Sequence, residues 1–426
     1  MKKYENFDVI RSEGSLANGV KVALFYKAGA PISTYAVFKS GSRYDPSNMP
    51  GVAHFIEHMI VNGSPEFPSK DLLAEHIESI GGSYSAFTSS DVMAVETQVP
   101  EKSDYSRVVD IYRATLCNPL MNEKVFENEK NIVIKEINKS NSNPQALLGK
   151  TSRKNFFQGT VYEHAVLGDE SAISSLAYED VMRQHKILLD GSRLTFIVGG
   201  DIELSEVIEY LNKLELFNSN RFDQEGFLGQ VVGGNKILAT NFDTQQTHLH
   251  FGVLSPPPFS RESMHLAILG TILAGGRSSR LTKRLRYKHG LVYGVGITRS
   301  GGELLDSWVI STDTTTDKVQ TVIDEIIAEI KLLHQDGVLE SELEFAKNRR
   351  VKSLKIMMQT AQSWVNFHFA SEIYPEKGYD LDAYIKYVNE TTTQDVKDVI
   401  HKYLKPDNWK LSLVGRNKEE EVKISW

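Results

Sequence analysis

Apolar and polar positions along the chain follow two periods, one helical and one of two residues, which predict helices and strands respectively. The segment "GVAHFIEHMIVNG", residues 51–63, is apolar with a helical repeat and lies between two helix breakers. It predicts a buried helix that His54, Glu57 and His58 interrupt. Because buried polar groups cost free energy unless they are paired, these three side chains need a compensating partner. The predicted core positions of this helix are Val52, Ala53, Phe55, Ile56, Met59, Ile60 and Val61.

The two halves of the chain repeat one plan. "EDVMRQHKILLDGSRLTFIVGGDI", from Glu179, and "QDVKDVIHKYLKPDNWKLSLVGRN", from Gln394, both read as an amphipathic helix, a turn and an apolar strand. Farther upstream, "FENEKNIVIKEINK" lines up with "EFAKNRRVKSLK" at nearly the same offset. Chance resemblance between similar segments is the alternative. The offsets of three pairs, Asp180 and Asp395, Val198 and Val414, and Lys130 and Lys347, agree within two residues and favour a duplication.

Each half reads as a strand, helices, further strands, two or more long helices and a closing strand. This order predicts an α+β fold of two homologous domains, each a largely antiparallel β-sheet packed against α-helices. The stretch "FNSNRFDQEGFLGQVVGGNK" is polar and glycine-rich, without a sustained period. We therefore expect one domain over residues 1–217, a linker over 218–236 and the second domain over 237–426.

Composition narrows the class of protein. The chain has 426 residues, of which 41% are hydrophobic and 24% charged, and its formal net charge is −7. That charge argues against a general nucleic-acid partner, and no apolar run is long enough to span a membrane. No leader follows the first methionine, so we expect a cytoplasmic protein. The single cysteine, Cys117, excludes an internal disulfide and is expected to be a small core residue.

The three polar residues of the first helix have the spacing of a metal site. On an α-helix His54 and His58 are one turn apart, and Glu57 lies on the same face. The order H-x-x-E-H reverses the commoner H-E-x-x-H zinc helix and is the pattern of inverted zinc peptidases. A catalytic zinc takes three protein ligands and keeps one position open, so a third ligand must come from elsewhere.

Candidates for the third ligand are Glu129 and Glu136, which share one face of a predicted helix whose positions Ile132, Val133 and Ile137 look buried. The alternative is an ordinary solvated helix face. In the second half the two acids become Ala346 and Ser353, and the helix that matches residues 51–63 keeps only His265. Loss of these groups as a set favours a chemical role in the first half.

The chain resembles the family of pitrilysin, insulin-degrading enzyme and mitochondrial processing peptidase. The resemblance rests on "PGVAHFIEHM", "FPSKDLLAEHIESIGGSYSAFTS", "FENEKNIVIKEI" and "LAGGRSSRLTKRLRYKHGLVYGV", and it spans nearly the whole sequence. It implies one Zn²⁺ per chain, held by His54, His58 and Glu136. It also implies Glu57 as general base, Glu129 as a support for the site, and a fold that forms half of a clamshell.

The resemblance also assigns residues to substrate. Arg286 and Tyr293 match the arginine and tyrosine with which the family's non-metal half grips substrate, and the tyrosine would stabilise the developing oxyanion. Ser85 and Ala86 stand where the family usually has Asn-Ala, which contacts the substrate backbone. Relatives of this length pair two chains, so we expect a homodimer, or a heterodimer with a related chain.

These residues together predict a zinc metallopeptidase that hydrolyses unfolded peptides or oligopeptides in a closed dimeric chamber. The alternative is a non-hydrolytic or partner-dependent subunit with a peptide-binding or assembly role. The complete set of His54, Glu57, His58 and Glu136 speaks against that alternative.

Two further patterns mimic sites. His248 and His250 share one face of a predicted strand, but no third ligand follows them, so we expect structural roles. The stretch "GGRSSRLTKRLR" looks like a phosphate-binding loop but lacks the Gly-Lys-Ser/Thr ending. A helix start with a cationic face is the simpler interpretation. Three tryptophans are expected in the core: Trp308, Trp364 and Trp409.

Overall fold

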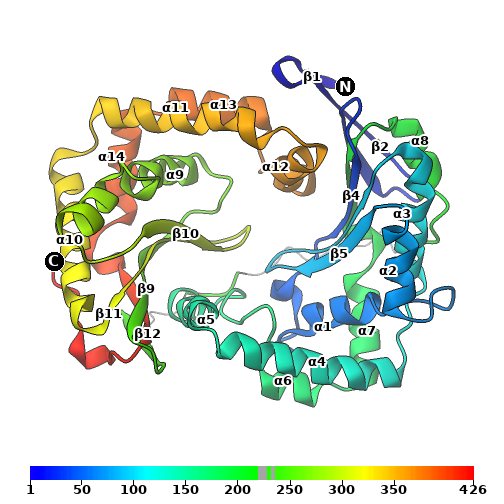
Figure 1. Ribbon diagram of the computed structural model, residues 1–426, viewed down its shortest axis with the longest axis horizontal. Coiled ribbons are helices and arrows are strands. Elements are labelled where there is room, and N and C mark those ends of the chain that lie inside the picture. The colour runs from blue at the N-terminus through cyan, green and yellow to red at the C-terminus, as the bar shows by residue number, and fades with distance from the viewer. Residues whose placement is uncertain (219–227, 232–235) are drawn as a thin grey trace. The chain divides into compact units, whose positions relative to one another are not determined.

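The computed structural model describes residues 1–218, 228–231 and 236–426 and divides into two compact units (Figure 1). Unit 1 contains Met1–Ile137, the described part of Ala165–Phe227, and Leu354–Leu381. Unit 2 contains Asn138–His164, Leu228–Ser353 and Asp382–Trp426. Most of the predicted linker, residues 219–227 and 232–235, lies outside the described residues, so the division at 218–236 stays a prediction.

A seven-stranded mixed sheet forms the centre of unit 1, with the strand order β1-β2-β3-β7-β4-β6-β5. Every neighbouring pair is antiparallel except β3 and β7, which are parallel. β5 is therefore an edge strand. The bounds are β1 Lys2–Tyr4, β2 Val9–Ser15, β3 Lys21–Tyr26, β4 Ile32–Phe38, β5 Ser83–Thr88, β6 Met93–Val99 and β7 Leu194–Gly200.

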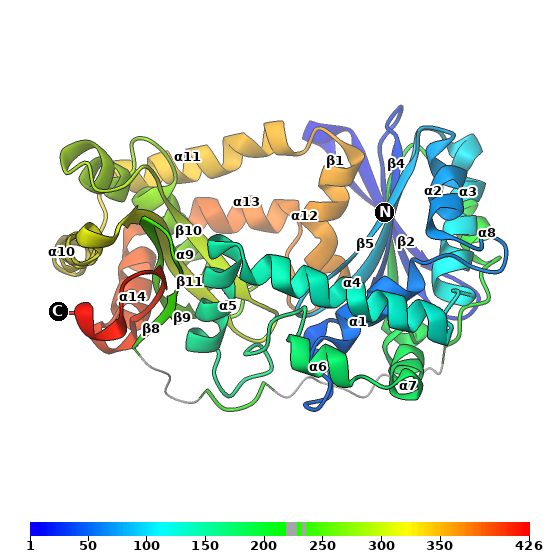
Figure 2. The same ribbon diagram turned by 60° about the horizontal axis from the view of Figure 1, so that its bottom comes forward.

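Helices cover both faces of this sheet. Figures 1 and 2 show α12 on one face and α2, α3 and α8 on the other, and α1 also packs against β5 and β6 on the second face. Strands β3, β4 and β6 bury side chains on both faces, whereas alternate residues of the edge strand β5 are exposed. The helices are α1 Val52–Ile60, α2 Lys70–Glu78, α3 Tyr105–Tyr112, α4 Glu123–Asn141, α6 Glu170–Ser175, α7 Tyr178–Leu188, α8 Leu204–Leu211 and α12 Ala361–Ile373.

Unit 2 contains a five-stranded sheet with the order β10-β11-β9-β12-β8, in which only β12 and β8 are parallel among the described strands. The strands are β8 Ile237–Asn241, β9 Gln246–Ser255, β10 Val295–Gly301, β11 Asp306–Thr315 and β12 Lys410–Gly415. The helices are α5 Pro144–Phe156, α9 Arg261–Ala274, a π-helix over Thr282–Lys288, α10 Val319–Asp336, α11 Glu340–Met357, α13 Leu381–Glu390 and α14 Thr393–Tyr403.

The two sheets confirm the predicted homology of the halves. The order β3-β7-β4-β6-β5 in unit 1 matches β8-β12-β9-β11-β10 in unit 2, and the parallel pair occupies the same place in each. Val198 and Val414, equivalent in the repeated sequence, lie on the matching strands β7 and β12. The predicted α+β class with largely antiparallel sheets is therefore confirmed.

One helix from each half of the sequence packs in the unit built mainly from the other half. α12 lies on β7, β4 and β3 of unit 1, and α5 lies on β12, β9 and β8 of unit 2. The two helices hold equivalent places in the duplicated order of elements. Each unit therefore needs a segment of the opposite half to cover one face of its sheet.

Burial agrees with most of the predicted core. Every predicted core position of the helix over residues 51–63 is buried, and so are Val133, Ile137 and the three tryptophans. Ile132, by contrast, is 46% exposed, because the buried stripe of α4 is narrower than the sequence suggests. Cys117 is only half-buried. Among the described residues, no helix has the length and apolar character that crossing a membrane requires, and the cytoplasmic location stays a prediction.

Candidate metal centre

Helix α1 begins at a turn that only glycine tolerates. Gly51 precedes the helix with φ of 92°, and an ideal Cβ there would lie 2.7 Å from the carbonyl oxygen of Leu167. The carboxylate of Asp45 accepts hydrogen bonds from the backbone N–H groups of Gly51 at 2.7 Å and Ala53 at 3.0 Å. These bonds satisfy donors that have no partner inside the helix and hold the start of α1 in place.

The three predicted ligands, His54, His58 and Glu136, converge on one point. Nε2 of His54 lies 3.8 Å and Nε2 of His58 3.4 Å from Oε2 of Glu136. One ligand atom from each of these residues lies within 4.8 Å of the others. Ligand atoms around one tetrahedral zinc lie about 3.3 Å apart, so the three side chains have nearly the spacing of a bound ion.

Glu129 supports His58 from the side away from Glu136. Oε2 of the buried Glu129 lies 3.0 Å from Nδ1 of His58. A carboxylate accepts the proton of Nδ1–H, and the lone pair of Nε2 is then free for a metal ion. Burial by itself lowers the pKa of His58, but the hydrogen bond with Glu129 and the neighbouring carboxylates raise it above its usual value.

The electrostatics of His54 also suit a metal ligand. Burial, with a smaller contribution from His58, lowers the pKa of His54 to about 4, so its imidazole is neutral at neutral pH. Its Nδ1 is buried without a hydrogen-bond partner among the described residues. Two imidazoles and a carboxylate form the donor set that a catalytic zinc takes, and the residues present therefore fit Zn²⁺.

Glu57 is held beside this group by Thr88. The hydroxyl of Thr88, at the end of edge strand β5, donates a hydrogen bond of 2.7 Å to Oε2 of Glu57. Burial raises the pKa of Glu57 above its usual value, although the bond from Thr88 opposes the shift. The carboxylate is thus oriented, and its affinity for a proton is increased, next to His58.

A pocket of about 410 Å³ opens beside Glu57 and His58 within unit 1. Both predicted substrate residues, Ser85 and Ala86, line it from β5. The remaining lining residues are Val61, Lys70, Asp71, Ala74, Glu78 and Tyr84. The sequence prediction therefore placed Ser85 and Ala86 next to the candidate metal centre.

The other predicted substrate residues, Arg286 and Tyr293, belong to unit 2. The guanidinium of Arg286 lies over the ring of Tyr293, 4.8 Å from its centroid. Tyr293 is 87% exposed, so its hydroxyl is open to a ligand. A large aromatic side chain gains little stability at such a position, which is consistent with a binding role.

The matching helices of unit 2 carry no equivalent group. Ala346, which replaces Glu129, is buried on α11. The two histidines of strand β9 have partners of their own. His248 pairs with Asp313, and His250 contacts the hydroxyl of Ser152 at 2.7 Å. Within the described ranges the only cluster of three or more potential metal-binding residues is the one in unit 1.

Sequence reasoning missed two residues of the site, Thr88 and Asp45. Thr88 could have been found from the period of two along β5, which puts it on the same face as Ala86. Asp45 lies in a loop, and no local pattern links it to the helix that it holds.

Curated relatives match this sequence over nearly their full length. The chain is 24% identical to an uncharacterized zinc protease of Rickettsia felis over 391 residues, which cover 90% of this chain and 92% of that protein. It is 24% identical to the uncharacterized zinc protease YmxG of Bacillus subtilis over 408 residues, or 93% and 96% of the two chains.

Solved structures share the fold. A protease from Helicobacter pylori matches with a TM-score of 0.87 at 17% identity, over 95% of this chain and 99% of that one. Pitrilysin matches with a TM-score of 0.78 at 19% identity, over 98% of this chain but 46% of its own. The family model for insulinase (peptidase family M16) matches residues 21–170, and the model for the peptidase M16 inactive domain matches residues 175–350. These models together cover most of the sequence, and the chain belongs to the insulinase family, peptidase family M16.

Proposed function

We propose that this chain is a zinc metallopeptidase that hydrolyses peptide bonds in unfolded peptides or oligopeptides. The observation that carries the proposal is the convergence of His54, His58 and Glu136 within 4.8 Å of one another. The names of the relatives, which are called zinc proteases, support zinc as the metal. The proposed stoichiometry is one Zn²⁺ per chain.

When bound by these three residues, zinc would polarise the peptide carbonyl and lower the pKa of a water molecule toward about 7. Glu57 is the proposed general base. Its raised pKa suits it to take a proton from the attacking water and then to deliver that proton to the leaving amine. Glu129 keeps the ring of His58 oriented throughout.

Substrate would bind along β5. This strand is at the edge of its sheet, so its outer N–H and C=O groups are free to pair with an extended peptide. Ser85 and Ala86 would then contact the peptide backbone beside the pocket next to Glu57. Backbone pairing tolerates many sequences, which favours unfolded peptides over a single partner.

Arg286 and Tyr293 of unit 2 are the proposed grip on the substrate, and in a dimer they would face the metal centre of the partner chain. The hydroxyl of Tyr293 would stabilise the developing oxyanion, and Arg286 would anchor a neighbouring carbonyl. The aligned region covers only 46% of the pitrilysin chain, so two copies of this chain are needed to match its length. That ratio supports a dimeric chamber, formed by two identical chains or with a related partner.

The test compares the purified protein with Glu57→Gln on a library of unstructured peptides, read by mass spectrometry. We expect cleavage by the wild type and none by Glu57→Gln, with equal zinc content in both proteins by elemental analysis. A matched control, Glu127→Gln on the exposed face of α4, should retain activity. Stoichiometric zinc without any cleavage would contradict the proposal and favour the peptide-binding or assembly role.

A further inference from the structure

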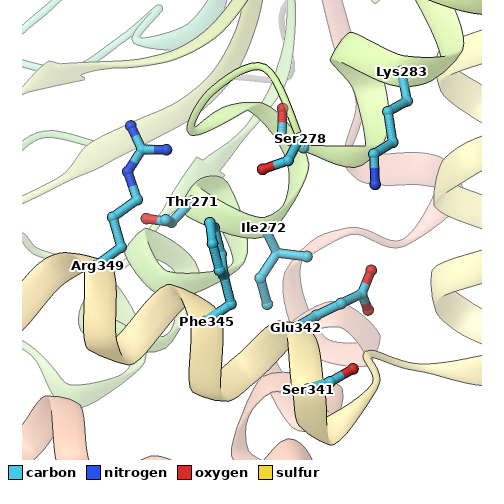
Figure 3. A pocket seen from close by; sticks show the side chains of 9 residues that line it. Thr271, Ile272, Ser278, Lys283, Ser341, Glu342, Phe345 and Arg349 are labelled. Atoms are coloured by element: carbon cyan, nitrogen blue, oxygen red, sulfur yellow. The ribbon is translucent and has the colours of Figure 1, made fainter.

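The loop "GGRSSRLTKRLR" forms one wall of a pocket in unit 2 (Figure 3). The pocket has a volume of about 250 Å³. Its walls come from the end of α9, from the loop and helix that follow it, and from α11. We call it the cationic pocket, and its lining residues are Thr271, Ile272, Ser278, Ser279, Lys283, Ser341, Glu342, Phe345 and Arg349.

Most of the arginines around this pocket are already paired. Arg280 donates to both carboxylate oxygens of Glu342, at 2.7 and 2.5 Å. Arg284 pairs with Glu325 at 2.6 Å. Arg350 donates to the hydroxyl of Tyr384 at 3.1 Å. These cations serve the fold, and they are not available to a ligand.

Arg349 and Lys283 differ from those arginines. Both are exposed, and neither side chain makes an ion pair or a hydrogen bond within the described part of the chain. The charge of Lys283 nevertheless acts on Glu342, whose pKa it helps to lower. The guanidinium of Arg349 lies against the loop backbone, where an ideal Cβ on Gly276 would be only 2.4 Å from its Nη1. In Figure 3 the two cations flank Ser278 and Phe345.

The charge of the pocket is therefore positive. Its lining contains two cations, Lys283 and Arg349, and one carboxylate, Glu342, which accepts two bonds from Arg280. Burial alone would raise the pKa of Glu342, but the hydrogen bonds from Arg280 hold it below its usual range. The lining therefore has a net positive charge, and the guanidinium of Arg349, which makes no hydrogen bond or ion pair within the described residues, is suited to an oxyanion.

The walls add an apolar surface. Ile272 is buried at the base of the pocket, and Phe345 is 54% exposed at its side although it is a large aromatic residue. The volume of about 250 Å³ leaves room for more than an isolated phosphate ion. An anion with an organic body fits these walls better than an inorganic ion.

We propose that the cationic pocket binds a small organic anion, with its acidic group at Arg349 and its apolar body against Phe345, while Lys283 adds positive charge from the opposite wall. A carboxylate and a phosphate present the same chemistry to a guanidinium, so two sources are possible. One is the C-terminal carboxylate of a peptide, and the other is a phosphorylated small molecule. The proposal does not depend on peptidase activity.

The test is calorimetric titration of the full-length protein with N-acetyl-L-phenylalanine, phenyl phosphate and inorganic phosphate. N-acetyl-L-phenylalanine amide, which lacks the charge, is the neutral control. We expect saturable binding of one or both organic acids with a Kd near or below about 1 mM, and weaker binding of inorganic phosphate and of the amide. Tighter binding of N-acetyl-L-phenylalanine would identify the ligand as the C-terminus of a peptide. Tighter binding of phenyl phosphate would identify it as a phosphorylated small molecule.

Substitutions at the pocket test whether the acid binds there. Arg349→Gln should weaken binding of the tighter-binding acid by about ten-fold, the effect of losing one charge-assisted hydrogen bond. Lys283→Gln, which removes a charge from the opposite wall, should weaken binding by less. Lys352→Gln removes an exposed charge from the same helix outside the pocket and should change nothing. Unchanged thermal midpoints would show that the variants are folded.

Three outcomes would overturn the proposal. The first is no saturable binding of either acid up to about 10 mM, which is too weak for a built site. The second is equal binding of the neutral amide. The third is binding that neither Arg349→Gln nor Lys283→Gln weakens. Because two variants are used, the test remains decisive even if one of them misfolds.

Discussion

Oε2 of Glu129 lies 3.0 Å from Nδ1 of His58, which joins the middle of α4 to the end of α1. On the other side of the same imidazole, Nε2 faces Glu136 at 3.4 Å. Two carboxylates one heptad apart on α4 thus contact the two nitrogens of a single histidine. This arrangement gives them different roles, because only the nitrogen without a proton can bind a metal ion.

Glu129→Gln should therefore weaken zinc binding. The loss of the carboxylate makes the imidazole of His58 a weaker ligand, and we expect an affinity lower by roughly 10- to 100-fold. Competition with a chromophoric chelator measures the change. Glu127→Gln, an exposed substitution on the same helix, is the control and should bind zinc like the wild type. Equal affinities in all three proteins would contradict the assigned role of Glu129.

Thr88→Val should lower kcat and leave zinc content intact. The substitution keeps the shape of the side chain and removes the hydroxyl that donates to Glu57 at 2.7 Å. Loss of one such bond corresponds to about ten-fold in rate. Thr88→Ser keeps the hydroxyl and should restore most of the activity. If Thr88→Val and Thr88→Ser reduced kcat equally, a role of Thr88 in packing would be the better explanation.

Tyr293→Phe should reduce kcat/KM without a change in stability. Loss of an oxyanion donor costs roughly 100-fold in rate, whereas the side chain is 87% exposed and contributes little to the core. The readouts are peptide hydrolysis and the thermal midpoint. Tyr287→Phe removes a hydroxyl from another exposed tyrosine nearby and should be silent. Full activity of Tyr293→Phe would exclude Tyr293 from the mechanism.

The stability of the fold should fall as the pH drops from about 6.5 to 4, in part because of His368. Its Nδ1 lies 3.0 Å from the carbonyl of Trp364, and its Nε2 lies 3.3 Å from the backbone N–H of Leu381. These contacts require the neutral ring with a proton on Nδ1 only. Burial lowers the pKa of His368 to about 4, despite the raising effects of the Trp364 carbonyl, Glu372 and Asp380.

The unfolded chain takes up this proton near the ordinary histidine pKa of about 6.5, before the folded chain does. The contribution of His368 to the free energy of unfolding is therefore fully present above pH 6.5 and decreases as the pH falls. By pH 4 the loss amounts to about 3 kcal/mol. Urea unfolding at several pH values measures it. His368→Phe should show a shallower pH slope than the wild type, and His164→Gln, at an exposed histidine, an unchanged one. Equal slopes in all three proteins would refute the prediction.

Trp364→Ala should destabilise unit 1 although residue 364 lies in the second half of the sequence. The side chain is fully buried, and its indole N–H donates to the carbonyl of Met358 at 3.0 Å. Truncation of such a residue costs about 3–5 kcal/mol. The measurement is equilibrium unfolding in urea, with Trp364→Phe as the milder control.

A fragment of residues 1–217 provides the complementary experiment. It lacks α12 and would expose one face of the sheet formed by β3, β7 and β4. We expect it to bind hydrophobic dyes and to lack a cooperative transition. A stable, cooperatively folding fragment would mean that α12 is dispensable for unit 1.

The sequence by itself determined the local geometry of the candidate site. The helical period alone puts His54, Glu57 and His58 on one face of α1, and seven residues separate Glu129 from Glu136 by two turns of α4. The repeated pattern of apolar positions also predicted the two homologous sheets, because both periods depend only on the backbone of each element. The resemblance of its motifs then indicated which acid is the third ligand.

Only the tertiary structure decided which elements meet. The contacts of His58 with Glu129 and Glu136 join residues far apart in the chain, and no local period encodes the distance between two helices. The hydrogen bond from Thr88 to Glu57 and the packing of α12 on the sheet of unit 1 also join distant segments. So do the ion pairs of Arg280 and Arg284, whereas the side chain of Arg349 makes none within the described residues. Such contacts depend on packing between whole faces, and packing is a property of the folded chain rather than of any segment of it.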